Sequence, residues 1–168
     1  MTALPASRPL SRYALATYAV AVLVMVLDQL SKAWILYSLH LADLGTVPLL
    51  PFFRLSLVWN RGFSFGLLSQ VDLARWLLSI FSIGVAIALA LWARKTTRPL
   101  PALGLGLIIG GAIGNAVDRV RMGAVVDFLD FTGTHVFPWV FNVADSGITA
   151  GVILLLADSL LAKPEARP

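Results

Sequence analysis

Four long apolar segments, at about residues 14–37, 72–93, 101–120 and 143–162, restrict the folds that this sequence can adopt. A helix needs about 20 mainly apolar residues to cross the hydrocarbon core of a bilayer, and each segment meets that length. Charged residues make up 13% of the chain, well below the roughly 25% of soluble domains. We therefore predict an all-α membrane protein with four transmembrane helices, forming a single domain over residues 1–168.

The first apolar segment carries two ionisable residues, Asp28 and Lys32. The segment lacks a clear small-residue cleavage site, so we interpret it as a retained helix and not as a removable signal peptide. The acid precedes the base by four positions, which places both on one helical face in the favoured order. They form either an intrahelical ion pair that assists membrane insertion or part of a functional site.

Two segments between the spans, about residues 40–70 and 122–141, are predicted to lie outside the membrane on one side. Pro48 and Pro51 oppose helix formation, and residues 54–60 partly alternate between apolar and polar, which predicts a small sheet. Residues 60–66, NRGFSFG, form either a turn with exposed aromatic side chains or a loop that contacts a ligand. The segment after Arg121 is typical of a short strand or an extended loop.

The distribution of basic residues predicts the orientation in the membrane. Four spans place both termini on one side, and seven of the 13 Lys and Arg residues lie in short segments on that side. Because short cytoplasmic segments are enriched in Lys and Arg, we expect both termini to be cytoplasmic. The seven residues are Arg8, Arg12, Arg94, Lys95, Arg98, Lys163 and Arg167.

Composition argues against several classes of protein. The chain has no cysteine, so it has neither a disulfide nor a thiolate nucleophile. His40 and His135 stand alone, outside any metal-binding motif, and we expect no metal and no cofactor. The formal charge of +4 is small and divided among short clusters, which argues against a nucleic-acid surface.

Polar residues from five separate segments are expected to meet at the outer side of the membrane. The first and third spans run outward, and their polar residues lie towards the outer ends, whereas the fourth span begins outside. Asn115, Asp118 and Arg119 share one helical face because they are three and four positions apart. The complete set is Asp28, Lys32, Asn60, Asn115, Asp118, Arg119, Asp127, Asn142 and Asp145.

Asp127 and Asp145 are the candidates for a catalytic carboxylate pair. Two carboxyl groups within a few ångströms share one proton, so that one activates water while the other polarises a carbonyl group. Asp145 is expected near a helix N-terminus, which favours its ionised form, whereas Asp127 lies among apolar neighbours and is expected to hold the proton. Arg119 would orient Asp118 or bind the substrate backbone or a lipid head group, and the three asparagines would donate amide hydrogen bonds.

Two other functions use the same residues. In a small proton-coupled transporter, Asp28, Asp118, Asp127 and Asp145 would form a proton relay. In a membrane scaffold, the ion pairs and the glycines of the third span would serve packing alone. A relay requires acidic groups across the thickness of the membrane, and the predicted cluster lies at one face, which favours the enzyme.

Four stretches in the same order resemble the bacterial lipoprotein signal peptidase (signal peptidase II) family. They are DQLSK at 28–32, NRGFSFG at 60–66, GGAIGNAVDRVRMGAVVDF at 110–128 and FNVADSGITAG at 141–151. The resemblance covers nearly the whole chain. It implies a membrane aspartic endopeptidase that cleaves diacylglyceryl-modified prolipoproteins just before the lipidated cysteine.

The resemblance also implies roles for individual residues. Asp127 and Asp145 match the catalytic pair, and Asp118 matches a structural position. The positions that match other motif residues, which support the site or contact substrate, are Asp28, Lys32, Asn60, Gly111, Asn115, Arg119, Asn142 and Ala144. The implied fold adds a small extracytoplasmic β-cradle and a short, mobile interfacial helix. The implied setting is the bacterial inner membrane, with membrane lipids as neighbours, globomycin-type cyclic peptides as inhibitors and a monomeric enzyme.

Overall fold

The computed structural model describes residues 10–62, 71–134 and 136–161. Within these ranges, four helices are long and apolar enough to cross a membrane, which confirms the predicted number of spans. Helix α1 (Arg12–Ala33) continues into a π-helix, η1 (Trp34–Ser38), which the sequence did not predict. The others are α3 (Val71–Ala93), α4 (Pro99–Met122) and α5 (Val143–Leu161).

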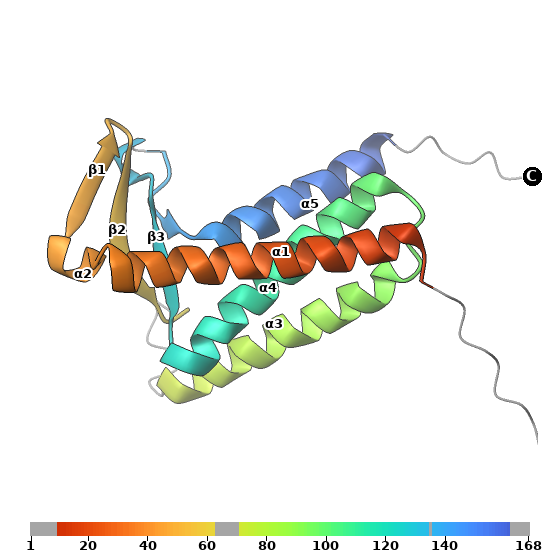
Figure 1. Cartoon of the computed structure of the whole chain (residues 1–168), viewed down its shortest axis with the longest axis horizontal. Helices are drawn as coiled ribbons and strands as arrows, with labels where there is room; N and C mark the ends of the chain where they lie inside the picture. The colour runs from red at the N-terminus through yellow and green to blue at the C-terminus, as the bar shows by residue number, and fades with distance from the viewer. Residues whose placement is uncertain (1–9, 63–70, 135, 162–168) are drawn as a thin grey trace, which may run out of the picture.

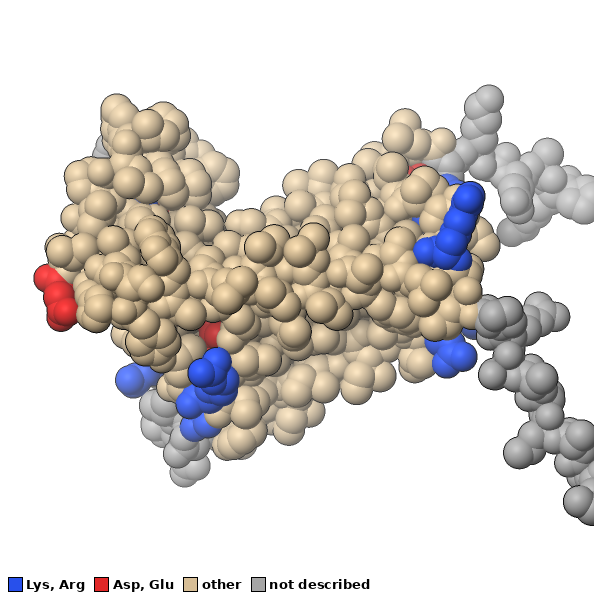
Figure 2. All heavy atoms as spheres, viewed as in Figure 1, with Lys and Arg blue, Asp and Glu red and all other residues tan. Residues whose placement is uncertain are grey.

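Helix α4 forms the centre of the bundle and packs against α1, α3 and α5 (Figure 1). Two thirds of its apolar window, 67%, is buried, compared with 17–28% in the other three helices. The outer faces of those three helices expose large apolar side chains, for example Leu30, Ile80 and Leu156. Lys and Arg side chains lie near the two ends of the bundle in Figure 2, and the surface between them is largely uncharged. This pattern suits helices surrounded by lipid.

A four-stranded antiparallel sheet covers one end of the bundle (Figure 1). Its strands follow the order β1 (Thr46–Leu50), β2 (Phe53–Asn60), β3 (Val125–Asp130) and β4 (Val140–Phe141). The small sheet predicted within residues 40–70 is confirmed, and of the two alternatives for the segment after Arg121 the structure shows the short strand, which joins the sheet as β3. Pairing of β2 with β3 sets Val58 opposite Asp127 and Asn60 opposite Val125.

The sheet is fixed to the bundle by an apolar cluster. Ile35 of η1 and Leu41 of the four-residue helix α2 (Leu41–Leu44) pack with Leu55, Val126 and Phe128 from β2 and β3. Residues 63–70, which include most of the NRGFSFG motif, lie outside the described ranges, so the mobile helix that the resemblance implies stays a prediction.

Gly123 caps the C-terminal end of helix α4, and this cap sets the direction in which the chain enters the next strand. Gly123 has a φ of +78°, in the left-handed region that glycine adopts readily, and its N–H bonds to the carbonyl of Arg119. The chain then turns away from the helix axis and enters β3, which carries Asp127. The end of α4, the start of α5 and strand β3 therefore meet at the sheet end of the bundle.

Candidate active site

Asn142 and Asp145 form a reciprocal cap at the start of α5. The Asn142 side-chain oxygen accepts a hydrogen bond from the Asp145 N–H at 2.8 Å, and the Asp145 Oδ2 accepts one from the Asn142 N–H at 3.3 Å. This is the arrangement of a capping box, with Asn and Asp in place of the usual residues. Asp145 thus lies at the start of α5, where it was expected; that the helix end favours its ionised form stays a prediction.

Asp127 receives an asparagine amide on each of its oxygens. Asn142 Nδ2 donates to Oδ1 at 2.7 Å, and Asn60 Nδ2 donates to Oδ2 at 2.9 Å. Burial raises the pKa of the Asp127 carboxyl group to about 6, and the charge of Asp145 also raises it, whereas the bonds from Asn60 and Asn142 lower it. The carboxyl group therefore holds a proton more readily than an ordinary aspartate.

Asn115 connects the two carboxyl groups from the side of α4. Its Nδ2 donates to Asp145 Oδ1 at 2.8 Å, and its Oδ1 accepts from Asn142 Nδ2 at 3.1 Å. Asp127 and Asp145 thus share Asn142 as a direct partner, and Asn115 joins the same chain of hydrogen bonds. These contacts connect β2, β3, α4 and α5 through side-chain amides.

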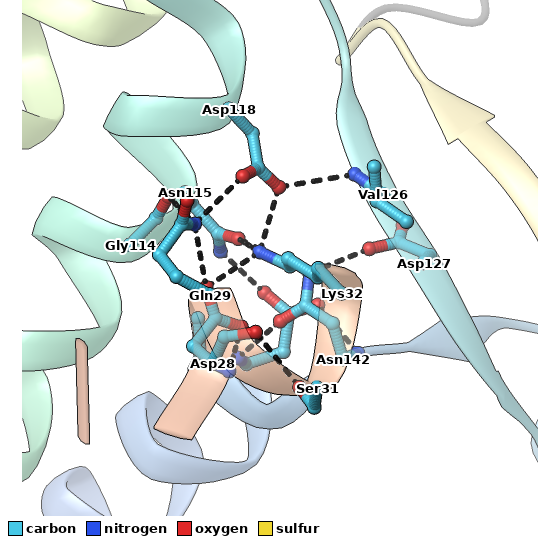
Figure 3. Close-up of polar contacts among 12 residues, drawn as sticks. Asp28, Gln29, Ser31, Lys32, Gly114, Asn115, Asp118, Val126, Asp127 and Asn142 are labelled. Carbon is cyan, nitrogen blue, oxygen red and sulfur yellow. Dashed lines mark hydrogen bonds and ion pairs between the residues drawn. The ribbon is translucent and has the colours of Figure 1, made fainter. Parts of the chain in front are cut away.

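Lys32 lies beside this group, between Asp28 and Asp118, and neutralises charge there (Figure 3). Its ammonium group lies 2.7 Å from Asp28 Oδ2 and 2.7 Å from Asp118 Oδ2, and it donates to Asn115 Oδ1 at 3.2 Å. All three charged side chains are buried. The intrahelical pair of Asp28 and Lys32 therefore exists, and it is also part of a network that reaches α4.

Asp28 supports the start of α5 from the opposite side. Its Oδ1 accepts a hydrogen bond from the Ala144 N–H at 2.9 Å, so it satisfies one of the free N–H groups of the helix end. Gly111 and Gly114 allow this approach. A Cβ on Gly111 would collide with the Ala144 carbonyl oxygen, and one on Gly114 would lie 2.6 Å from Asp28 Oδ2.

Asp118 connects the network to the strand that carries Asp127. Its Oδ2 accepts from the Val126 N–H at 3.2 Å, and its Oδ1 accepts from Gln29 Nε2 at 2.8 Å (Figure 3). Sequence reasoning did not identify Gln29 as a site residue, although it lies between Asp28 and Lys32 in a quoted motif. The same amide also lies 3.3 Å from the Gly114 carbonyl oxygen.

Among the predicted site residues that carry a charged side chain, Arg119 makes the fewest polar contacts in the described part of the chain. Its only hydrogen bond within the described ranges is a long one, 3.4 Å, from Nη1 to the Asn115 carbonyl, and its buried Nε has none there. The guanidinium group lies in the field of Asp118, Asp127 and Asp145. Among the described residues, most of its N–H donors therefore have no partner.

Both carboxyl groups line an open cleft between the sheet and α5. Asp127 lines a hollow of about 460 Å³, and Asp145 lines an adjoining one of about 320 Å³. Asn60, Trp139 and Val140 line both hollows, so the two lie next to each other. Trp139 forms a wall that both hollows share, and it was not among the predicted site residues.

The arrangement is suited to chemistry on water and a carbonyl group. It offers two carboxyl groups in different surroundings, a guanidinium group with few partners among the described residues, and open space beside both carboxyl groups. Within the described residues, no group of three His, Asp or Glu side chains could hold a metal ion. The structure brings ten of the eleven predicted residues into one connected group of contacts. Gly111 contributes by its lack of a side chain.

The chain is similar to known proteins over most of its length. A family described as "Signal peptidase (SPase) II" matches residues 20–161. A lipoprotein signal peptidase of Caulobacter vibrioides is 54% identical over 94% of both chains, and one of Shewanella oneidensis is 45% identical over 84% of both. Two solved structures of bacterial membrane enzymes superpose with TM-scores of 0.78 and 0.74, at 29% and 30% identity, covering 94% and 96% of this chain and all of theirs.

Proposed function

The chain belongs to the signal peptidase II family, and from this premise we propose that it removes signal peptides from prolipoproteins by an aspartic mechanism. The observation that carries the proposal is the convergence of Asp127 and Asp145 on Asn142 at an open cleft. No feature of the described residues favours the proton relay of a transporter. The polar network lies at the sheet end and does not run through the bundle.

In the proposed mechanism the two carboxyl groups differ in protonation. Ionised Asp145, stabilised by the start of α5, takes a proton from water, and the water oxygen attacks the scissile carbonyl carbon. Asp127 transfers its proton to the carbonyl oxygen, so that a tetrahedral gem-diol forms with Asp127 ionised and Asp145 protonated. Asp145 then gives its proton to the amide nitrogen, and the C–N bond breaks as Asp127 takes a proton back from one gem-diol hydroxyl group. The products are a carboxylic acid and an amine, and both aspartates return to their first states.

The remaining predicted residues support these two groups. Asn60, Asn115 and Asn142 hold the carboxyl oxygens in place, and Asp28, Lys32, Gly111 and Ala144 fix the start of α5. Asp118 has a structural role, since it binds the N–H of Val126 beside Asp127. Arg119 would donate to a carbonyl oxygen of the substrate backbone or to the phosphate of a lipid head group.

The position of the cleft fits a substrate anchored in lipid. We propose that a diacylglyceryl-modified cysteine holds the scissile bond at the outer surface of the bacterial inner membrane, while the signal helix stays in the bilayer. Binding energy from the lipid, remote from the reacting carbonyl, would then position the bond for attack. The proposal includes inhibition by globomycin-type cyclic peptides whose hydroxyl group lies between the carboxyl groups, and a monomeric enzyme with cytoplasmic termini.

Substitution of the two acids tests the proposal. Asp127→Asn and Asp145→Asn should each lower the rate of prolipoprotein cleavage by at least about a thousandfold, because each removes one partner of the proton transfer. Cleavage is measured by gel shift of a purified lipid-modified prolipoprotein, and folding by thermal unfolding in the same detergent. Asp43→Asn, at an exposed position in α2, is the matched control. Normal cleavage by either site variant would refute the aspartic mechanism.

A further inference from the structure

A second cavity lies at the opposite end of the bundle from the proposed active site. It encloses about 420 Å³ between the loop that joins α3 to α4 and the last turns of α5. Its lining combines basic, hydroxyl-bearing and apolar side chains, and it has no part in the mechanism proposed above. The lining residues are Trp92, Lys95, Thr96, Thr97, Arg98, Pro101, Leu155, Asp158 and Ser159.

The charge of the lining favours an anion. Among the described residues that line the cavity, Lys95 and Arg98 are basic and Asp158 is acidic, which gives this lining a formal charge of +1. Asp158 binds one nitrogen of Arg98 at 2.6 Å, so the guanidinium group is held in place with further N–H groups free. Lys95 makes no ion pair within the described part of the chain. Three hydroxyl groups, from Thr96, Thr97 and Ser159, add neutral donors suited to phosphate oxygens.

The loop that bears these groups is already ordered. The Lys95 N–H bonds to the Trp92 carbonyl at 2.9 Å, and the Thr96 N–H bonds to the Ala93 carbonyl at 3.1 Å. The Ser11 hydroxyl group donates to the Thr96 carbonyl at 3.1 Å and ties the loop to the start of α1. Because the site is preformed, binding of a ligand costs little conformational entropy of the loop.

The apolar part of the lining continues onto the lipid-facing surface. Trp92 is half exposed at the end of α3, in the position that tryptophan prefers at a membrane interface. Leu155 lies in α5, and the nearby Leu156 and Leu160 of the same helix are exposed. A ligand with a charged head and hydrocarbon tails would place the head in the cavity and the tails along these helices. A free anion would leave the apolar surface unused.

We propose that this cavity binds the phosphodiester head group of an anionic phospholipid. Basic pockets between transmembrane helices on the cytoplasmic side recognise such head groups, and on the proposed orientation this end of the bundle faces the cytoplasm. Lys95 and the free N–H groups of Arg98 bind the phosphate, the hydroxyl groups bind its remaining oxygens, and Trp92 packs against the glycerol region. The site is independent of the aspartic mechanism.

Lipid binding to the full-length protein in a neutral detergent tests the proposal. Native mass spectrometry compares short-chain phosphatidylglycerol with phosphatidylcholine of the same chain length. The wild type should retain phosphatidylglycerol preferentially, and Lys95→Gln should weaken that binding about fivefold, because one basic group near the phosphate is lost. Arg94→Gln, the adjacent basic residue outside the cavity, should change binding less than about twofold.

Three outcomes would overturn the proposal. The first is equal retention of the two lipids by the wild type. The second is equal weakening of phosphatidylglycerol binding by Lys95→Gln and Arg94→Gln. The third is displacement of phosphatidylglycerol by inorganic phosphate at the same concentration as the lipid. The first comparison needs no variant, so a folding defect cannot obscure it. Prolipoprotein cleavage by Lys95→Gln should stay at the wild-type rate, because the cavity lies at the other end of the bundle, and this separates failure of the lipid site from failure of the proposed function.

Discussion

At the scale of single residues, Asn142 combines two roles that are usually separate. Its side-chain oxygen caps α5 by binding the N–H of Asp145, and its side-chain nitrogen binds Asp127. The first contact stabilises the helix, whereas the second orients a carboxyl group in the cleft. One asparagine thus couples the folding of α5 to the geometry of the proposed catalytic pair.

Substitutions at Asn142 should separate these roles. Asn142→Ala should lower the free energy of unfolding by about 1 kcal/mol through loss of the cap, and should also lower cleavage strongly. Asn142→Ser should recover most of the stability, because serine is a good N-cap, but not the cleavage, because it lacks the amide donor to Asp127. Thermal unfolding and cleavage rates of both variants provide the measurement. If serine restored both properties equally, the contact with Asp127 would have no catalytic importance.

The raised pKa of Asp127 predicts how stability depends on pH. The carboxyl group titrates near 3.8 when unfolded and near 6 in the folded protein. Between these values the folded state binds more protons than the unfolded state, so this group's contribution to stability is present below about pH 4 and is lost as pH rises through about 6. Asp127→Asn removes this contribution, since an amide does not titrate.

Thermal unfolding from pH 4 to 7 measures the effect. The melting temperature of the wild type should fall relative to that of Asp127→Asn across this range, and Asp43→Asn should follow the wild type. A constant difference between the wild type and Asp127→Asn would show that the carboxyl group titrates alike in both states, contrary to the burial described above.

At the scale of elements, the site depends on how closely α4 approaches α5. Gly111 faces the Ala144 carbonyl and the side chain of Ile148, with no space for a methyl group. Backbone atoms cannot move aside as a flexible side chain can, so any larger residue must push the start of α5 away from α4. Ala144 and Asp145 would move with it, and their contacts with Asp28 and Asn115 would lengthen.

Alanine substitutions at two glycines test this packing. Gly111→Ala should reduce the free energy of unfolding by about 1–3 kcal/mol through overpacking and should also reduce cleavage. Gly84→Ala is the matched control, because a Cβ at that position in α3 has no atom within 4 Å. It should be neutral or stabilising, since alanine favours helix over glycine by about 0.5–1 kcal/mol. Equal stability of the two variants would contradict the close approach.

At the scale of the whole molecule, the sheet lies at one end of the bundle (Figures 1 and 2). The loop that joins α3 to α4, called the basic loop below, lies at the other end. The proposed orientation puts the sheet outside and the basic loop in the cytoplasm. Because the chain has no cysteine, single cysteines can report each end without background labelling. Thr46 in β1 and Thr97 in the loop are both exposed threonines and form a matched pair.

Labelling with a membrane-impermeant maleimide measures the orientation. In intact spheroplasts, Thr46→Cys should react and Thr97→Cys should not, and both should react once the membrane is permeabilised. The expectation rests on the excess of Lys and Arg in short segments at the Thr97 end. If only Thr97→Cys were labelled in intact spheroplasts, the orientation would be the opposite of the one proposed, and the cleft would lie on the cytoplasmic side.

The sequence by itself determined the features that depend on local composition. Apolar length predicted the four spans, because a bilayer demands about 20 apolar residues per crossing. The position of each polar residue along its span predicted a layer of polar groups at one end. Alternation in residues 54–60 predicted strand β2, and the placement of Asp145 at a predicted helix start agrees with α5 beginning at Val143.

Only the tertiary structure decided which side chains in that layer meet. The pairing of β2 with β3, the capping of α5 by Asp28 and the contact of Gln29 with Asp118 join residues more than 60 positions apart. No local pattern encodes such contacts, because they depend on how the helices pack and on the register of the strands. Trp139 became a wall of the cleft for the same reason: its surroundings are set by β2, β3 and α5 together, not by its neighbours in sequence.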